Sequence, residues 1–254
     1  MLRVNKLKEK LNQGKTVIGP FMKLSSPAVV EVLGNAGFDF VIIDTEHGPI
    51  STETAENLIR AAELVGITPI VRVSNNDSNQ ISKALDIGAL GIQVPQISSG
   101  EDAKKAVKSC KYSPKGERGV CRFVRAASYS AMNRFEYFSM SNNETLVILQ
   151  VEGTEGVNEL DQILEVPDVD IIFLGPYDLS QSLGLPGQID HPKVEAKMCE
   201  VISKAKKKGI TIGTFVDNIS NANKWQSLGV QYISYSVDVG IFYEAGQDII
   251  KKLK

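Results

Sequence analysis

Short apolar runs alternate with longer amphipathic segments along the whole chain. This alternation is typical of βα units, in which each strand of a parallel sheet is followed by a helix that covers it. Eight such units fit a (β/α)8 TIM barrel, and a single domain over residues 1–254 matches the usual size of that fold. The strands are expected at 16–21, 38–44, 68–73, 91–95, 145–152, 169–175, 210–216 and 231–237.

Local signals between these runs mark where helices begin. Ser51 and Ser99 stand before segments with acidic first turns, and Asp190 stands two residues before a proline, so each is expected to begin a helix. One connection, residues 112–143, is much longer than the others. Connections of this length in compact domains are usually functional or locally structured.

Composition excludes several classes of function. Hydrophobic residues make up 43% and charged residues 23%, as in an ordinary globular protein. The net charge of -2 gives no basic surface for nucleic acid, and no apolar run is long enough to cross a membrane, so a cytoplasmic location is expected. The three cysteines are widely spaced and lack a Cys-x-x-Cys pair, which predicts free thiols.

Polar side chains gather where the expected strands end, which is the catalytic face of such a barrel. Gln150 and Glu152 are two residues apart, so both should point into the barrel while Leu149 and Val151 point outward. A buried carboxylate needs a cation, a salt bridge or a proton. Asp178, after the next strand, could converge with Glu152 on one hard divalent cation.

Arg72 and His47 end neighbouring strands, near Asp44 and Glu46. Arg72 could neutralise the negative charge of a 2-oxo acid bound to such a cation, because the planar guanidinium group can donate two parallel hydrogen bonds to carboxylate or enolate oxygens. A histidine beside a carboxylate can move a proton near neutral pH. Two alternatives stay open: Glu152 and Asp178 could cap helices and pair with Arg72, and His47 could merely cap a loop. His191 is expected to be a surface residue at a helix start.

Taken together, several motifs resemble those of the HpcH/HpaI aldolase family, which belongs to the phosphoenolpyruvate/pyruvate barrel superfamily and includes 4-hydroxy-2-oxoheptanedioate and 2-dehydro-3-deoxyglucarate aldolases. The resemblance covers nearly the whole chain, and its motifs are specific only in combination. The matching segments are 19–27 (GPFMKLSSP), 44–47 (DTEH), Arg72, 118–120 (RGV), 125–128 (RAAS), 150–152 (QVE) and 175–180 (GPYDLS).

The resemblance implies a class II aldolase, in which a divalent ion (Mg, Mn or Co) is held by Glu152 and Asp178. It implies that Arg72 stabilises the enolate of pyruvate and that Gln150 positions this donor. It further implies that His47, supported by Asp44, transfers the proton. The other residues expected to bind substrate lie in the same motifs: Phe21, where the family commonly has Trp, together with Tyr177 and Ser180.

The resemblance also implies a homohexamer, built as a trimer of dimers that exchange their C-terminal helices. The segment 239–253 has an apolar face suited to this exchange, although packing on its own barrel would explain the face equally well. The substrates are expected to be a small 2-oxo acid and an aldehyde.

Other functions remain open at this stage. The same metal-stabilised enolate would serve an oxaloacetate-type 2-oxo acid decarboxylase. Lys23, after the first strand, would be the candidate for a Schiff-base aldolase. A phosphate-binding barrel and a non-catalytic barrel are further alternatives, since fold does not fix function.

Overall fold

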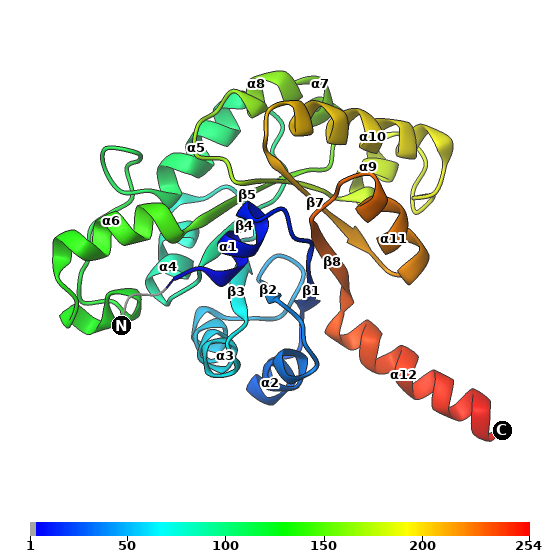
Figure 1. Ribbon diagram of the computed structural model, residues 1–254, viewed down its shortest axis with the longest axis horizontal. Coiled ribbons are helices and arrows are strands. Elements are labelled where there is room, and N and C mark those ends of the chain that lie inside the picture. Colours follow the sequence, from blue (N-terminus) through cyan, green and yellow to red (C-terminus); the bar gives the residue numbers. More distant parts are fainter. Residues whose placement is uncertain (1–3) are drawn as a thin grey trace.

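The chain closes into a barrel of eight parallel strands, each paired with the next and the last paired with the first (Figure 1). The structure is a computed structural model that describes residues 4–254. It confirms the expected (β/α)8 barrel, and every strand lies within two residues of its expected bounds. The strands are β1 Val17–Met22, β2 Phe40–Asp44, β3 Thr68–Arg72, β4 Gly91–Val94, β5 Leu146–Val151, β6 Ile171–Leu174, β7 Thr211–Val216 and β8 Tyr232–Val237.

Helices surround the barrel and occupy the expected positions. Ser51 and Ser99 cap α3 and α5, as predicted, by accepting backbone N–H bonds with their hydroxyl oxygens. The prediction for Asp190 was wrong, because the cap of α10 is His191, whose Nδ1 accepts the N–H of Lys193. The helices are α1 Lys6–Asn12, α2 Pro27–Asn35, α3 Thr52–Val65, α4 Ser78–Asp86, α5 Gly100–Cys110, the 3-10 helix η1 Arg125–Ser130, α6 Arg134–Glu144, α7 Thr154–Asn158, α8 Leu160–Leu164, α9 Pro176–Ser182, α10 Pro192–Lys207, α11 Ile219–Ser227 and α12 Asp238–Leu253.

The long connection before β5 is locally structured, since it contains η1 and α6. Tyr112 and Tyr137 from this region pack together as a small buried cluster of their own. The segment therefore folds against the side of the barrel, as expected for an ordered insertion.

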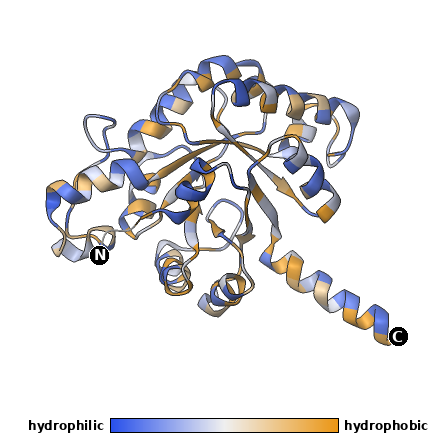
Figure 2. Cartoon of the chain, viewed as in Figure 1, coloured by the Kyte–Doolittle hydropathy of each residue, from blue (hydrophilic) through white to orange (hydrophobic). Residues whose placement is uncertain are grey.

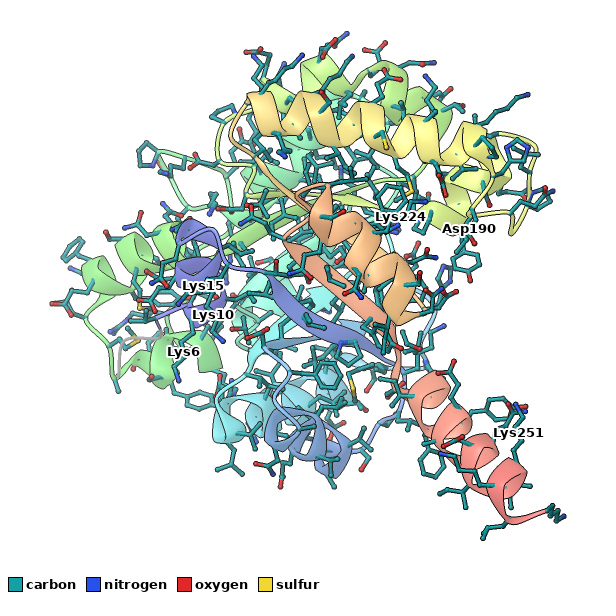
Figure 3. The ribbon with its side chains drawn as sticks, turned by 45° about the vertical axis from the view of Figure 1, so that its right-hand side comes forward. Lys6, Lys10, Lys15, Asp190, Lys224 and Lys251 are labelled. Carbon is teal, nitrogen blue, oxygen red and sulfur yellow. The ribbon has the colours of Figure 1, made fainter. Side chains whose placement is uncertain are left out.

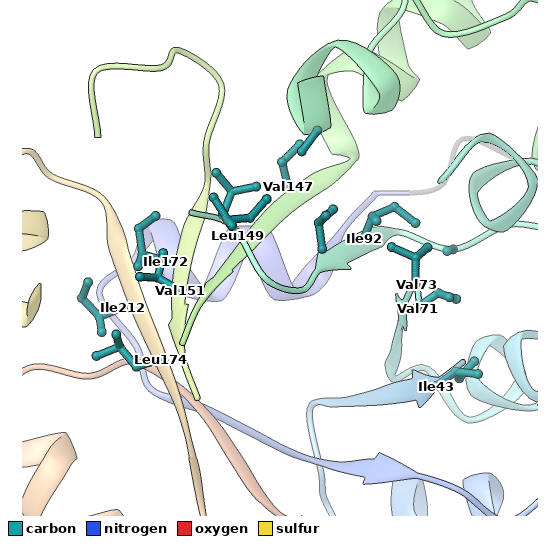
Figure 4. Packing of buried hydrophobic residues seen from close by; sticks show 14 of the residues in the cluster. Ile43, Val71, Val73, Ile92, Val147, Leu149, Val151, Ile172, Leu174 and Ile212 are labelled. Carbon is teal, nitrogen blue, oxygen red and sulfur yellow. The ribbon is translucent and has the colours of Figure 1, made fainter. Parts of the chain in front are cut away.

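Alternating side chains of each strand divide the core into two layers. Leu149 and Val151 of β5 lie in the layer between strands and helices, together with Val147 and Ile172 (Figure 4). Leu146 and Ile148 lie in the barrel interior. Because the period of a strand is two, Gln150 must follow Ile148 into the interior.

The N-terminal end of the barrel is closed by α1. Leu7 and Leu11 of this helix pack into the interior cluster. The side chain of Asn5 donates to the carbonyls of Leu90 (3.0 Å) and Glu144 (2.8 Å), which precede β4 and β5. In Figure 3, Lys6, Lys10 and Lys15 lie around this helix. The opposite end, where the strands finish, is the end at which active sites of such barrels lie.

The C-terminal helix α12 leaves the barrel and projects away from it (Figure 1). Apolar residues recur along its length (Figure 2), yet in the single chain most of them face solvent. Among the described residues, no helix has the length and apolarity needed to cross a membrane. The exposed apolar residues of α12 are Val239, Phe242, Tyr243, Ile249, Ile250 and Leu253.

We expect Leu7→Ala to lower the free energy of unfolding by about 2 to 4 kcal/mol, because it leaves a cavity in the barrel floor. Leu64→Ala is the matched control, since Leu64 is 76% exposed on α3 and its truncation should change stability by about 0.5 kcal/mol or less. Urea denaturation followed by circular dichroism measures both. Equal effects would contradict the role given to α1.

Candidate active site

The C-terminal ends of the strands bring most of the predicted site residues around one cavity of about 370 Å³. The strand register accounts for part of this, because Asp44 is aligned with Arg72 and Arg72 with Gln93. The predicted residues that line the cavity are Phe21, Asp44, His47, Arg72, Gln150, Tyr177 and Asp178. Lys23, the candidate for the Schiff-base alternative, also lines it, and the lining residues without a predicted role are Phe173, Gly175, Pro176, Phe215, Asp217 and Val237.

Arg72 is the buried cation of the site. Its Nε donates to Asp44 Oδ1 at 3.0 Å and its Nη2 to Asp44 Oδ2 at 2.8 Å. Its Nη1 lies 2.9 Å from Glu46 Oε2, and its guanidinium stacks over the ring of Phe21. The ion pairs of Arg72 thus go to Asp44 and Glu46. The alternative in which Arg72 neutralises Glu152 and Asp178 is not the pairing seen.

Glu152 follows β5 and is buried; it does not line the cavity itself but lies against Gln150 and Gly175, which do. Its Oε1 accepts the backbone N–H of Gln96 at 2.9 Å, and its Oε2 accepts from Nε2 of Gln150. Gln150 in turn accepts from Nε2 of Gln93 at 2.6 Å, so a chain of amides fixes the carboxylate. A Cβ on Gly175 would lie 2.8 Å from Oε2 and 3.0 Å from the Cβ of Glu152, so a larger residue there would displace this carboxylate from its present position.

Acidic groups repel one another around Glu152. Burial, followed by the charges of Asp178 and Glu46, raises the pKa of Glu152 to about 7 despite its hydrogen bonds. Burial also raises the pKa of Glu46, where Arg72 acts in the opposite direction and Asp44 and Asp178 add to the rise. Four carboxylates therefore influence one another at this end of the barrel, while Arg72 pairs with two of them, Asp44 and Glu46. A cation would relieve this local excess of negative charge.

The donor atoms near Glu152 fit a hard divalent ion. Glu152 follows β5, and Asp178 lies in the first turn of α9, directly after the neighbouring β6. Within residues 4–254, no group of three His, Cys, Asp or Glu side chains forms a ready-made metal site. Two carboxylates would leave the remaining coordination positions to water and substrate, as Mg²⁺ commonly requires.

His47 stands at the rim of the cavity, with 61% of its side chain exposed. Its Nε2 lies 3.9 Å from Glu46 Oε2. Asp44 Oδ1 instead accepts the backbone N–H groups of Glu46 (3.1 Å) and His47 (3.2 Å). Asp44 therefore shapes the turn that carries His47, and the carboxylate beside the ring is Glu46. The contact of Asp44 with His47 is thus through the backbone, and its role in proton transfer stays a prediction.

Aromatic rings form the other wall. Phe21 lies near Phe173 and Phe215, with ring centroids 6.2 and 6.1 Å apart. The ring of Tyr177 also packs against Phe215, and its hydroxyl donates to Asp217 Oδ2 at 2.6 Å. This hydrogen bond is the largest cause that raises the pKa of Tyr177 to about 12. The hydroxyl therefore stays protonated at neutral pH.

Ser180 does not line the cavity. It is fully buried within α9, where its hydroxyl donates to the carbonyl of Tyr177 and accepts the N–H of Gly187. Its position corrects the expectation that it binds substrate, because both hydrogen-bonding functions of the hydroxyl are used to fix the turn after α9.

Sequence reasoning gave no role to Gln93, Glu46 or Asp217. Gln93 could have been found from strand alternation, because it is a polar residue within an expected buried strand and shares its inward face with Gly91. Glu46 was noticed beside His47, but its contact with Arg72 depends on how the loop after β2 folds. Asp217 follows β7 and carried no distinguishing signal.

Known proteins of one family are similar to this chain over nearly its whole length. The HpcH/HpaI aldolase/citrate lyase family matches residues 17–245. A hydroxypyruvate/pyruvate aldolase of Roseobacter denitrificans is 32% identical over 99% of this chain and 98% of its own length. A 4-hydroxy-2-oxo-heptane-1,7-dioate aldolase of Escherichia coli is 34% identical over 96% of this chain and 92% of its own. The crystal structure of the citrate synthase SbnG superposes with a TM-score of 0.88 at 35% identity, covering 97% and 96% of the two chains.

The pKa of Glu152 leads to a stability prediction for metal-free protein. Its folded value of about 7 lies above the ordinary 4.5, so its contribution to folding is present at acid pH and is lost as the pH rises through about 7. We expect Glu152→Gln in EDTA to stabilise the protein at pH 8 by on the order of 2 kcal/mol and to change little at pH 4.5. Thermal unfolding at the two pH values measures this.

Added Mg²⁺ or Mn²⁺ provides the control for this variant. The ions should raise the melting temperature of the wild type at pH 8 and that of Glu152→Gln much less. An equal rise in both proteins would contradict the assignment of Glu152 as a ligand.

Proposed function

The chain belongs to the HpcH/HpaI aldolase/citrate lyase family, and from this premise we propose that it is a divalent-metal-dependent aldolase. It would cleave or form a carbon–carbon bond between the enolate of pyruvate, or a similar 2-oxo acid, and an aldehyde. The observation that supports the proposal is that Glu152 and Asp178 follow the neighbouring strands β5 and β6 at the same end of the barrel, where the charge of Asp178 contributes to raising the pKa of Glu152. The two aldolase relatives, whose names carry such activities, support it.

Glu152 and Asp178 are the residues that would hold the ion. Mg²⁺, Mn²⁺ or Co²⁺ bound there would act as a Lewis acid toward the oxygens of the 2-oxo acid. Arg72 is fixed by two carboxylates and would share the negative charge that develops on the same substrate. Gln150, held between Gln93 and Glu152, would position the donor through its amide.

His47 is the candidate for proton transfer. In the cleavage direction, the proton of the 4-hydroxyl must leave as the C3–C4 bond breaks, and it must be returned when the bond forms. His47 lies at the rim of the same cavity, beside Glu46, and would take or give this proton directly or through a water molecule. The aromatic wall of Phe21 and Phe215 would exclude bulk water from the reacting carbons.

Decarboxylation of an oxaloacetate-type acid is the second candidate, because it uses the same enolate and the same residues. The two reactions differ in whether the fragment that leaves is carbon dioxide or an aldehyde. A Schiff-base mechanism would instead need Lys23 as the nucleophile, and borohydride would then trap a covalent adduct with substrate. Activity that survives EDTA would favour that route.

Solvent-deuterium exchange into the methyl group of pyruvate tests the enolate step without any acceptor. We expect exchange with added Mg²⁺, Mn²⁺ or Co²⁺ and loss of exchange in EDTA. Glu152→Ala and Asp178→Ala should both abolish it, because each removes a proposed ligand. NMR of the methyl signal measures the rate. Full exchange in either variant would contradict the site, and its absence from metal-loaded wild type would contradict the proposed function.

His47→Ala should lower the rate of aldol cleavage by about 10² to 10⁴ if His47 is the acid–base group. His191→Ala is the matched control, since His191 caps α10 and does not line the cavity. The readout is kcat measured with a saturating aldol substrate. A similar small loss in both variants would assign proton transfer to another group.

We also propose that the chain assembles as a homohexamer of dimers that exchange α12. Support comes from the helix itself, which projects from its own barrel while Phe242 is 79% exposed (Figure 1). Figure 3 shows Lys251 on the same projecting helix, far from α1. Packing on its own barrel, the alternative explanation for the apolar face, is not seen in this structure.

Phe242→Asp should break the assembly, because it places a charge on the face that a neighbouring copy would cover. Glu244→Lys on the same helix is the charge-changing control and should leave the assembly intact. Size-exclusion chromatography with light scattering gives the mass of each. A monomeric wild type would contradict this part of the proposal.

A further inference from the structure

Within residues 4–254, β4 is the strand of the barrel that contributes no side chain to the cavity, whereas each of the other seven strands contributes at least one. The end of β4 nevertheless makes two connections to Glu152. The backbone N–H of Gln96 donates to Oε1 of Glu152 at 2.9 Å, and the amide of Gln93 reaches Oε2 through Gln150. This strand therefore supports the site from outside the cavity.

Gln93 is the residue of β4 that faces the barrel interior, because Ile92 and Val94 on either side of it pack in the outer layer. It is completely buried, and its Nε2 donates to Oε1 of Gln150 at 2.6 Å. Gln150 lines the cavity, but Gln93 does not. Any effect of Gln93 on a ligand therefore passes through a neighbouring residue, and Gln150 is the neighbour to which it is hydrogen-bonded.

The carboxylate of Glu152 fixes the direction of this chain of amides. A carboxylate that holds a cation has no hydrogen to donate, so Gln150 must face Glu152 with its NH2 group. The carbonyl oxygen of Gln150 then faces the other way and needs a donor, which is the NH2 group of Gln93. Without that donor, Gln150 would keep a buried acceptor unpaired or would rotate its amide away from Glu152.

This direction leaves the carbonyl oxygen of Gln93 unpaired. Its Oε1 is buried and has no hydrogen-bond partner in the part of the chain that the structure describes. A buried carbonyl oxygen without a partner destabilises the fold. A methionine of similar length would fill the same space without this effect. The amide of Gln93 is therefore explained by the hydrogen bond that it donates and not by packing.

The turn after β4 contains a second destabilising feature that serves the same carboxylate. Gln96 has a φ of 55°, in the left-handed region that residues other than glycine rarely adopt. In this conformation its N–H donates to Oε1 of Glu152. Strained backbone of this kind is concentrated at functional sites. The end of β4 thus restrains both oxygens of Glu152, one directly and the other through Gln150.

We propose that Gln93 is a positioning residue for the metal site and for the 2-oxo acid. By donating to Gln150, it holds the amide of Gln150 in the direction that keeps the carboxylate of Glu152 in place for a divalent cation. An NH2 group has two donors, so one N–H of Gln150 remains for a ligand in the cavity. This inference rests on the proposed aldolase function and adds to it a residue outside the cavity.

Gln93→Met tests this role, because it removes the donor and nearly preserves the volume. We expect the Kd of Mn²⁺, measured by isothermal titration calorimetry without substrate, to rise about tenfold, as is common when a residue that supports a metal ligand is lost. The KM for pyruvate in deuterium exchange should also rise. At saturating Mn²⁺ and pyruvate, kcat should stay within about threefold of the wild type, because the groups that contact the substrate are retained.

The double variant Gln93→Met/Gln150→Met distinguishes action through Gln150 from a general structural effect. If Gln93 acts through Gln150, adding Gln93→Met to Gln150→Met should not raise the Kd of Mn²⁺ further, whereas independent effects would multiply. Gln93→Asn keeps the amide but is one methylene too short to reach Gln150, so it should weaken Mn²⁺ binding as Gln93→Met does. It provides a second test if the methionine variant does not fold.

Gln162→Met is the matched control, because Gln162 is exposed on α8 and lies outside the cavity, and it should leave the Kd of Mn²⁺ unchanged. An unchanged Kd and KM in folded Gln93→Met, or multiplied losses in the double variant, would overturn the role of Gln93. Exchange into pyruvate by the wild type separates the two failures. Normal metal-dependent exchange with an unaffected Gln93→Met defeats only this inference, whereas absence of exchange in the wild type defeats the aldolase itself.

Discussion

The buried ion pair between Arg72 and Asp44 is the interaction on which the open end of the barrel depends. It joins the last residues of β2 and β3, and Thr45 extends the join by donating its N–H and hydroxyl to the carbonyl of Arg72. Burying two charges is costly, so such a pair persists where both groups stay fully bonded. Arg72 pairs with Asp44 and Glu46, and within residues 4–254 neither Glu152, after β5, nor Asp178, on α9, forms an ion pair with a Lys or Arg side chain. The excess negative charge is therefore a result of how Arg72 is paired.

Much of the fold could be predicted from the sequence because its signals are periodic and local. Alternation of apolar runs located all eight strands, and a spacing of two placed Gln150 and Glu152 inside the barrel. Contacts between side chains of different strands were harder to predict from the sequence, because they depend on strand register and on the shape of the loops. Asp44 was expected to support His47, and the structure shows that its contact is with the backbone of His47. Ser180 belongs to a turn that its neighbouring sequence does not reveal.

Stability and function are divided between the two ends of the barrel. The end closed by α1 is apolar, with Leu7 and Leu11 filling the interior. The opposite end holds the buried carboxylate of Glu152, whose pKa is raised by burial and which packs closely against Gly175. Burying a carboxylate in this way costs free energy of folding. Such destabilising arrangements are common at catalytic sites, where a bound ligand offsets the cost. Apolar packing at the end closed by α1 therefore stabilises the fold and offsets the destabilising effect of the buried charges at the other end.

The closure by α1 has a consequence for the order in which the chain can fold. Asn5 is synthesised 139 residues before Glu144, one of its main partners. Until that segment has been made, Leu7 and Leu11 have no interior to enter. In a half-barrel made of the first strands, α1 would therefore be exposed to solvent. Packing of α1 into the barrel interior can occur only after β5 has been synthesised.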